Sequence, residues 1–181
     1  METWVKKDRL YKGRIFSVVV GEVSLDNGNL VTREIVEHSG GVAIVPILSG
    51  SVLLIRQFRI AIGREILELP AGRLEGDEGP EACARRELEE ELGYLADHMT
   101  LLASYYSSPG FTNERMHIFL AYGLHETARK PEFDERLGQV QITISDVERK
   151  LATREFEDSR TIIGLREMLA YLANHPEIAA R

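Results

Sequence analysis

One stretch of the sequence, residues 72–94 (GRLEGDEGPEACARRELEEELGY), constrains the fold more than any other. Pro80 suits the first position of a helix, where its fixed φ is favourable and its missing N–H is not needed. Gly93 suits the left-handed conformation that often follows the end of a helix. Apolar residues recur at intervals of three or four, at Ala84, Leu88, Leu92 and Leu95. The pattern predicts a helix that begins near Pro80 and packs one face on a core.

Carboxylates crowd the last turn of this predicted helix. Glu87, Glu89, Glu90 and Glu91 occupy four of five positions, and only two arginines lie close before them. Like charges at these spacings cost an isolated helix roughly 0.2–0.5 kcal/mol per pair. One interpretation is a solvated acidic surface, which is the usual place for charged residues. The other is a site for a divalent cation, because Mg²⁺ prefers oxygen ligands and binds through one or two carboxylates together with substrate phosphates.

The spacing of this stretch resembles the Nudix box. Written as G-x5-E-x7-R-E-U-x-E-E-x-G-U, with U a bulky apolar residue, the motif is matched at Gly72, Glu78, Arg86, Glu87, Leu88, Glu90, Glu91 and Gly93. Tyr94 departs from it, because the last position is usually aliphatic. Nudix proteins typically hydrolyse a nucleoside diphosphate linked to another moiety, using Mg²⁺ or Mn²⁺. The resemblance therefore implies a metal-dependent enzyme.

The residues before this stretch predict a two-part organisation. Residues 1–38 are rich in β-branched and aromatic residues, and they contain the segment Asp26-Asn27-Gly28-Asn29. Asn-Gly is a strong hairpin signal because it tolerates the positive φ values of a type I′ turn. Ser39-Gly40-Gly41 follows as a flexible joint. We therefore expect a small N-terminal antiparallel β-sheet in residues 1–38 and a second domain in residues 39–181.

The second domain is predicted to be an α/β fold. Strands are expected at 42–48, 52–58, 65–69, 101–106, 116–122 and 140–144, and the first two are apolar enough to be covered on both faces. Residues 126–138 are polar and predict an exposed loop. Ser145-Asp146-Val147-Glu148 matches a capping box, and a last helix, 159–173, carries Ile162, Leu165, Leu169 and Leu172 on one face. These elements make an α/β/α sandwich, and the Nudix resemblance implies the same fold with a mixed sheet.

Composition narrows the class of partner. The 181 residues include 22 basic and 29 acidic residues, and this net charge of −7 argues against broad binding to nucleic acid or membrane surfaces. No stretch approaches 18 apolar residues, and the first ten residues lack the apolar run of a signal peptide. With Cys83 as the single cysteine, neither an intrachain disulfide nor a Cys-rich zinc site is expected. We expect a cytoplasmic protein that acts on a small molecule.

By analogy with the Nudix family, the metal ligands are expected within and just before the box. Glu87 and Glu91, one helical turn apart, are the first candidates, and Glu90 and the backbone carbonyl of Ala71 are the next. Arg86, also expected in the catalytic site, should pair with the first glutamate of the box and orient the ligand helix. Metal ions held in this way bridge phosphate oxygens and lower the pKa of bound water.

Two further segments resemble the ADP-ribose pyrophosphatase branch of the family. Pro109 lies sixteen residues after Gly93, where the residues alone predict a Pro-Gly turn. The segment Arg56-Gln57-Phe58-Arg59 is similar to a strand motif of that branch, in which the second arginine reaches the substrate. Without this resemblance, Arg59 would be predicted to be a surface residue. The resemblance implies hydrolysis of ADP-ribose to AMP and ribose 5-phosphate. It also implies that the N-terminal sheet helps to form an intertwined homodimer.

The same branch implies residues that bind the nucleoside. Phe16, Arg33 and Glu34 lie on the N-terminal sheet where related enzymes bind the base. An adenine needs an aromatic face or a guanidinium to stack on. The alternative for Phe16 is a place in the core, and for Arg33 and Glu34 a surface pair. Glu114 is a candidate for contact with the ribose or with metal-bound water.

The general base is expected in the loop before the last strand. We choose Glu135 and keep Asp134 as the alternative, against the simpler interpretation of a solvated acidic loop. A carboxylate close to metal-bound water can act with an ordinary pKa. The mechanism implied is attack of an activated water on one phosphorus of the diphosphate.

The sequence leaves two other functions open. The substrate could be another nucleoside diphosphate derivative such as GDP-mannose, NADH or FAD, because stacking does not select the base. A protein of a different class would be a Nudix metabolite sensor without catalysis. Such sensors often lose box glutamates and carry a DNA-binding domain, whereas every box glutamate is present here and no basic helix follows.

Overall fold

The chain folds into two compact units in the computed structural model, which describes residues 1–129 and 136–179. One unit consists of residues 1–40 and 105–115, and the other of residues 41–104 and 116–181. The division falls between Gly40 and Gly41. The grouping of residues 105–115 with the N-terminal residues was not predicted, because it depends on contacts between segments far apart in the sequence.

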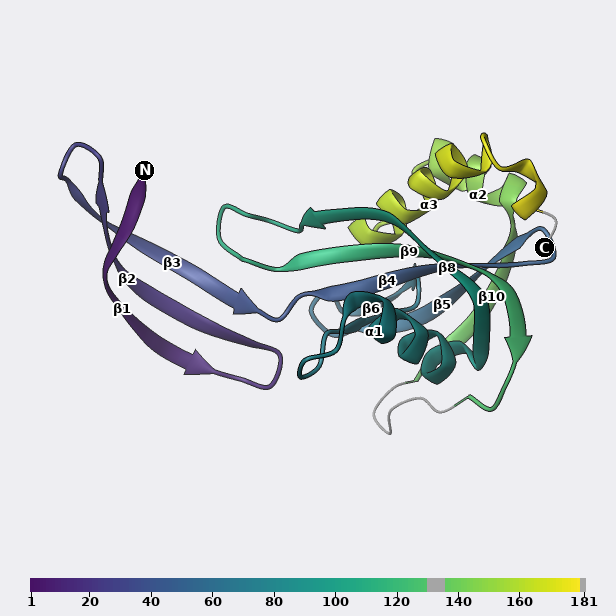
Figure 1. The fold of residues 1–181 in the computed structure, drawn as a ribbon, viewed down its shortest axis with the longest axis horizontal. Coiled ribbons are helices and arrows are strands. Elements are labelled where there is room, and N and C mark those ends of the chain that lie inside the picture. The colour runs from purple at the N-terminus through teal and green to yellow at the C-terminus, as the bar shows by residue number, and fades with distance from the viewer. Residues whose placement is uncertain (130–135, 180–181) are drawn as a thin grey trace. The chain divides into compact units, whose positions relative to one another are not determined.

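The first unit contains a three-stranded antiparallel sheet in the order β1-β2-β3 (Figure 1). Its strands are β1 (Glu2–Lys12), β2 (Phe16–Leu25) and β3 (Leu30–His38). Residues 105–115 attach to β3, where the N–H of Val36 donates to the carbonyl of Phe111 at 2.8 Å and the N–H of His38 donates to Oδ1 of Asn113 at 2.8 Å.

The predicted hairpin between β2 and β3 is present, but its turn is not type I′. Gly28 has a φ of 81°, whereas Asn27 is not among the residues with positive φ, and four residues separate the strands. The side chain of Asn27 instead accepts a hydrogen bond from the N–H of Asn29 at 3.0 Å. A two-residue turn with positive φ at both positions occurs elsewhere, at Ser49 (48°) and Gly50 (74°).

The second unit is built on a seven-stranded mixed sheet. Its strands are β4 (Gly41–Leu48), β5 (Ser51–Arg59), β6 (Arg64–Glu68), β7 (Ala71–Arg73), β8 (Tyr94–Tyr106), β9 (Arg115–Glu126) and β10 (Gly138–Thr143). The main order is β10-β5-β4-β9-β8, with β6 beside β5 and β7 beside β4. β4 is parallel to β9 and antiparallel to β5, which confirms the mixed sheet. Residues 41–47 are all buried, so this strand is covered on both faces as predicted.

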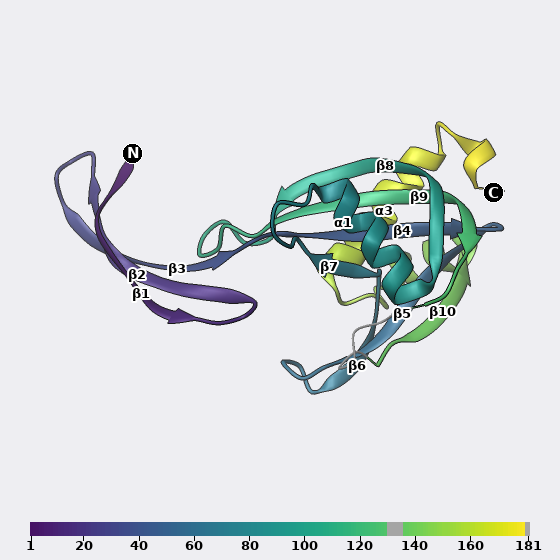
Figure 2. The same ribbon diagram turned by 60° about the horizontal axis from the view of Figure 1, so that its bottom comes forward.

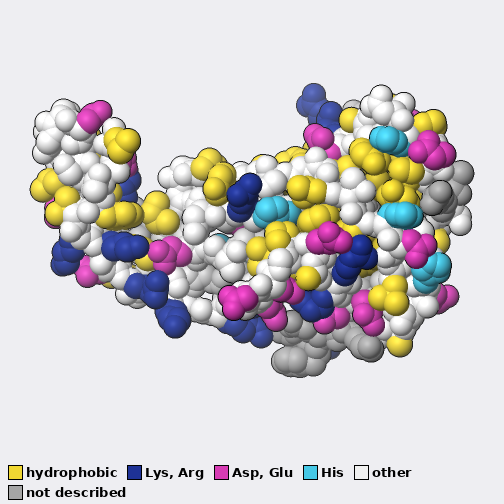
Figure 3. Space-filling view, in the orientation of Figure 1, with side chains coloured by type: hydrophobic (Ala, Val, Ile, Leu, Met, Phe, Trp, Pro, Cys, Tyr) yellow, Lys and Arg dark blue, Asp and Glu magenta, His cyan; other side chains and the backbone are white. Residues whose placement is uncertain are grey.

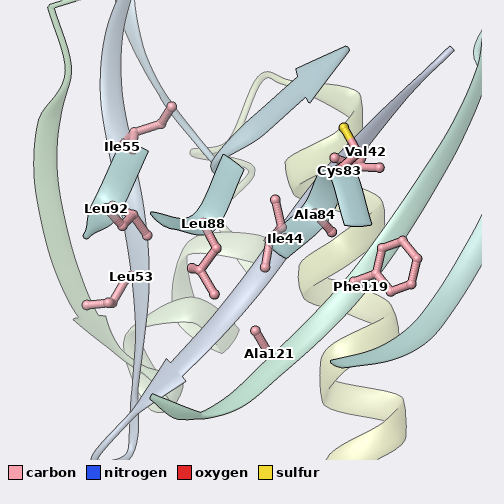
Figure 4. Close-up of a cluster of buried hydrophobic side chains, with 10 residues drawn as sticks. All are labelled: Val42, Ile44, Leu53, Ile55, Cys83, Ala84, Leu88, Leu92, Phe119 and Ala121. Carbon is pink, nitrogen blue, oxygen red and sulfur yellow. The ribbon is translucent and has the colours of Figure 1, made fainter. Parts of the chain in front are cut away.

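Helices cover both faces of this sheet, which confirms the predicted α/β/α sandwich (Figures 1 and 2). α1 (Pro80–Glu87) packs on one face, and α3 (Ser159–Leu172) lies on the other beside α2 (Ile144–Ala152). Beneath α1, apolar side chains of helix and strands form one cluster (Figure 4), made of Val42, Ile44, Leu53, Ile55, Cys83, Ala84, Leu88, Leu92, Phe119 and Ala121. None of the helices in the described residues is long and apolar enough to cross a membrane.

Three details of the helices differ from the prediction. Leu95 lies in β8 and is exposed, because the chain leaves the helix at Gly93. α2 begins at Ile144, and its N-cap is Thr143 rather than Ser145; Oγ1 of Thr143 accepts from the N–H of Asp146 at 3.1 Å. The buried face of α3 runs through Thr161, Gly164, Leu165, Met168 and Leu172, while Ile162 and Leu169 are half-buried.

The position of α3 follows from Gly164. A Cβ added there would lie 2.6 Å from Cδ1 of Leu69, so the helix approaches the sheet too closely for a larger residue. Because of this close contact, the side of α3 with the small residues faces the sheet. The buried face is therefore shifted by about one residue from the face that the apolar periodicity predicted.

Candidate active site

The acidic helix predicted from the sequence ends in an irregular turn. Pro80 occupies the start of α1, and Gly93 has a φ of 75°, both as predicted. Between α1 and Gly93, the residues Leu88–Leu92 (η1) form a π-helical turn. Such turns inside α-helices are rare and often occur at functional sites. The residue pattern carries no signal for this turn, because α and π spacing differ by only one residue.

Two carboxylates of this helix converge on the loop that leads into the box. Glu91 is 1% exposed, and its Oε2 accepts from the N–H of Ala71 at 2.9 Å. Glu87 is 9% exposed and packs against Gly72; a Cβ at Gly72 would lie 1.7 Å from Oε1 of Glu87. A glycine is therefore required at position 72 for the carboxylate to occupy this place.

The segment from Leu69 to Ala71 is held by three different elements. The N–H of Leu69 donates to Oγ1 of Thr161 on α3 at 2.9 Å. The carbonyl of Pro70 accepts from the N–H of Ile44 on β4 at 2.9 Å, and the next N–H reaches Glu91. Hydrogen bonds on successive residues fix the backbone next to the acidic helix, so the Ala71 carbonyl occupies a defined position.

Arg86 is the cation that joins the acidic residues. It binds Glu78 through Nη2 at 2.8 Å and Nε at 3.3 Å, which is the ion pair predicted from the motif. Its Nη1 donates to Glu87 at 2.7 Å and to Glu90 at 2.9 Å. The hydrogen bond with Arg86 is the main reason that the pKa of Glu78 is lowered to about 2. The same bond raises the pKa of Arg86 above its usual value.

The donor set around Ala71 has the chemistry that a hard cation requires. Glu87 and Glu91 are both buried carboxylates that lie against residues 71 and 72 at the start of β7, and oxygen ligands of this kind suit Mg²⁺. Among residues 1–129 and 136–179, no three acidic, histidine or cysteine side chains are already grouped as a metal site. Arg86 binds Glu87 and Glu90, two of the predicted ligands. The residues therefore fit the cation by chemistry and burial.

The other predicted site residues of the second unit are placed as follows. Arg59 binds the carboxylate of Glu68, which is 1% exposed, at 2.6 Å and 2.8 Å. Cys83 is buried, and burial is the main cause that raises its pKa to about 12, so its thiol stays protonated. Glu135 and Asp134, our two choices for the general base, lie outside the described residues.

The residues predicted to bind the nucleoside belong to the first unit. Phe16 is exposed at the start of β2 and not in the core, and its ring lies 5.7 Å from that of Tyr11. Arg33 forms a hydrogen bond from Nε to Glu2 at 2.9 Å, while Glu34 is exposed. The carboxylate of Glu114 lies 3.6 Å from Nδ1 of His38.

A hollow of about 360 Å³ in the first unit was missed by sequence reasoning. It is lined by Glu2, Trp4, Val23, Arg33, Ile35, Pro109 and Gly110, so it contains the single tryptophan of the chain together with the arginine and the proline singled out above. An indole and a guanidinium are both suited to stacking on a planar base. Arg33 and Pro109 had been singled out from the sequence, whereas Trp4, the single tryptophan, had not.

Known proteins resemble this chain in sequence and in fold. The family model described as NUDIX domain matches residues 37–163. The ADP-ribose pyrophosphatase of Bacillus subtilis (strain 168) is 38% identical over 167 residues, which cover 91% of this chain and 90% of that protein. The methanol dehydrogenase activator of Bacillus methanolicus is 35% identical, with the same coverage. A crystal structure described as an ADP compounds hydrolase matches 96% of this chain and 95% of its own with a TM-score of 0.86; at 24% identity it supports the fold alone.

Replacing Gly72 with alanine tests the close contact with Glu87. We expect Gly72→Ala to lower the free energy of unfolding by about 1–3 kcal/mol, because the added methyl group must displace a buried carboxylate from its arginine. Urea denaturation followed by circular dichroism measures this change. Gly79→Ala is the matched control, since a Cβ at Gly79 meets no atom within 4 Å and its φ is −76°. Equal losses in the two variants would contradict the assignment.

Glu78 makes the stability of the site depend on pH in a defined direction. Its folded-state pKa is about 2 against an ordinary value of 4.5. The carboxylate therefore contributes its full stability above about pH 4.5 and loses it as the pH falls through about 2. The difference in unfolding free energy between wild type and Glu78→Gln should stay constant from pH 7 to about pH 5 and shrink below that. Denaturant titrations across this range measure it, with Asp77→Asn, an exposed carboxylate of the same loop, as the control.

Proposed function

Because the chain belongs to the Nudix family, we propose that it is a pyrophosphohydrolase of nucleoside diphosphate sugars that converts ADP-ribose to AMP and ribose 5-phosphate. The observation that carries the proposal is the convergence of the box carboxylates Glu87 and Glu91 on the backbone at Ala71 and Gly72. ADP-ribose as the substrate is supported by the relative from Bacillus subtilis that carries this activity in its name and by the hollow that contains Trp4 and Arg33.

Mg²⁺ is the cofactor that we propose, and we expect Mn²⁺ to substitute for it. Glu87, Glu90, Glu91 and the carbonyl of Ala71 would hold it. When bound, a divalent ion polarises phosphate oxygens and lowers the pKa of water. Arg86 holds the carboxylates of Glu87 and Glu90 in place, and its bond to Glu78 fixes the loop in front of the helix. Glu135, with Asp134 as the alternative, is our candidate for the base that takes the proton from the attacking water.

The nucleoside part of the substrate is assigned to the first unit. The exposed ring of Phe16 offers a stacking face. Arg33 has its Nε held by Glu2, so the flat face of its guanidinium is the part suited to stacking. Glu34 and Glu114 supply carboxylate acceptors for the base edge and the ribose hydroxyls.

We also propose that the protein is a homodimer that associates through the N-terminal sheet. This sheet exposes many large apolar side chains (Figure 3), namely Trp4, Val5, Leu10, Tyr11, Ile15, Phe16 and Leu30. A soluble monomer rarely leaves so many apolar residues on one small sheet in water. A cytoplasmic location is part of the proposal, because the substrate is a nucleotide derivative.

A hydrolysis screen tests the proposed substrate. With Mg²⁺ present, we expect ADP-ribose to be cleaved with a kcat/KM at least about tenfold above that of GDP-mannose, NADH or FAD, and EDTA should abolish the reaction. Released monophosphate is the measured product. Preference for GDP-mannose, NADH or FAD would replace the proposed substrate with that compound, and cleavage of none of the four would contradict the enzyme assignment in favour of a metabolite sensor.

Within the same screen, Glu91→Gln should lower kcat by a factor of about 10³ or more without unfolding the protein. The amide keeps an oxygen that can accept from the N–H of Ala71, so the fold is retained while the ligand charge is lost. Glu89→Gln, on the same turn but outside the motif, is the matched control and should retain activity. Activity retained by Glu91→Gln would show that this carboxylate is not a metal ligand.

Light scattering after size-exclusion chromatography tests the dimer. The wild type is expected to have twice the mass of one chain, 20.4 kDa, and Leu10→Arg should shift the population to monomer because it places a charge in the apolar interface. Leu101→Arg, which changes an exposed leucine of β8, should leave the mass unchanged. A wild type that elutes as a monomer at micromolar concentration contradicts the proposal.

A further inference from the structure

A buried carboxylate outside the Nudix box lies next to the candidate site. Glu68 is the last residue of β6 and is 1% exposed. Arg59 donates from Nε to Oε1 at 2.8 Å and from Nη2 to Oε2 at 2.6 Å. Arg160 donates from Nη2 to Oε2 at 2.9 Å. The two parallel bonds from Arg59 fix the plane of its guanidinium.

Stability alone does not favour a carboxylate at this position. Burying an ion pair costs several kcal/mol for each charge, and well-packed apolar residues of similar volume are often at least as stable. The charge of Glu68 therefore points to a need for orientation of its arginine partners.

Arg59 keeps one edge of its guanidinium open. Its side chain is 36% exposed, and its Nη1 has no hydrogen-bond partner in the part of the chain that the structure describes. The bond with Glu68 is the main cause that raises its pKa, and the charges of Asp158 and Glu91 contribute. Its carboxylate partner, Glu68, lies three residues before Ala71 in the chain. A guanidinium with one edge held and one edge open is suited to binding a phosphate.

Arg160, near the start of α3, binds the carboxylate of Glu68. Its Nε donates to Oδ1 of Asp158 at 3.2 Å, and Oδ2 of Asp158 caps the helix by accepting from the N–H of Thr161 at 2.9 Å. Thr161 in turn holds the N–H of Leu69, the residue after Glu68. Glu68 is thus held by Arg160 through its side chain, and the N–H of the next residue is bonded to α3.

We propose that Glu68 is a positioning residue for substrate binding: it holds Arg59 so that the open edge of the guanidinium meets a phosphate of the nucleoside diphosphate, and Arg160 holds Glu68 in place. The inference rests on the proposed function for the identity of that ligand. Its chemistry requires an anionic phosphate and no metal ion, so it can be tested without turnover.

Calorimetric titration of ADP-ribose in EDTA provides this test. Glu68→Gln keeps the size of the side chain but removes its charge and one acceptor, and it should weaken binding about tenfold. Arg160→Gln, which leaves the pair of Glu68 and Arg59 intact, should weaken binding by a smaller factor, about two to five. Because both act through Arg59, neither should weaken binding further in the Arg59→Ala background. Far-UV circular dichroism checks that each variant is folded.

Glu157→Gln is the matched control. Glu157 binds Arg64 of the same strand, β6, at 2.6 Å and comes from the segment just before α3, but this pair is exposed. Its loss should change the affinity by less than about twofold.

Three outcomes overturn the inference. The first is a wild type that binds no ADP-ribose, and the second is that the Glu68 and Arg160 variants bind it as tightly as the wild type. The third is that these variants lose the same affinity in the Arg59→Ala background as in the wild type. Binding that depends on Arg59 and Glu68 without hydrolysis in Mg²⁺ contradicts the proposed function and supports the inference. Hydrolysis by a wild type whose binding is unaffected by Glu68→Gln contradicts the inference alone.

Discussion

The bonds between Arg86 and three carboxylates are the interaction on which the candidate site depends. Glu78, Glu87 and Glu90 would repel one another on adjacent turns of loop and helix, and one guanidinium binds all three at 2.7–2.9 Å. Because Arg86 also reaches the carbonyl of Arg73, the loop before the helix is fixed to the helix itself. The positive charge of Arg86 thus offsets the repulsion among three carboxylates that lie close together.

Two buried carboxylates lie close to the Leu69–Ala71 segment, and each accepts hydrogen bonds from a different kind of donor. Glu68 is bound by two arginines, whereas Glu91 accepts a backbone N–H beside the proposed metal site. The segment is bonded to α3, β4 and η1 on successive residues. A short backbone held from three sides can present a carbonyl at a fixed position, which is the preorganisation that binding a metal and a diphosphate demands.

Local sequence patterns predicted the helices and strands well, but they predicted poorly which side chains of these elements are buried. The limits set by Pro80 and Gly93, the buried strand 41–47 and the hairpin at Gly28 all depend on residues close in the sequence. Two errors arose where one element ends and the next begins: Leu95 continued the apolar periodicity but falls beyond the glycine that ends the helix, and the cap of α2 is Thr143, where β10 ends. A third error, in the buried face of α3, depends on a distant contact, that of Gly164 with Leu69.

By itself, the sequence determined the family and the helix that carries the acidic residues, since a motif with fixed spacing specifies which side chains share a face of a helix. The ion pair of Glu78 with Arg86 followed from the resemblance to the family motif. Only the tertiary structure decided that Glu91 meets Ala71 and that Arg160, 92 positions along the chain, meets Glu68. Periodicity describes how side chains repeat along one element. Which buried charges become partners depends on the strands and helices that pack together, and that is set by the core as a whole.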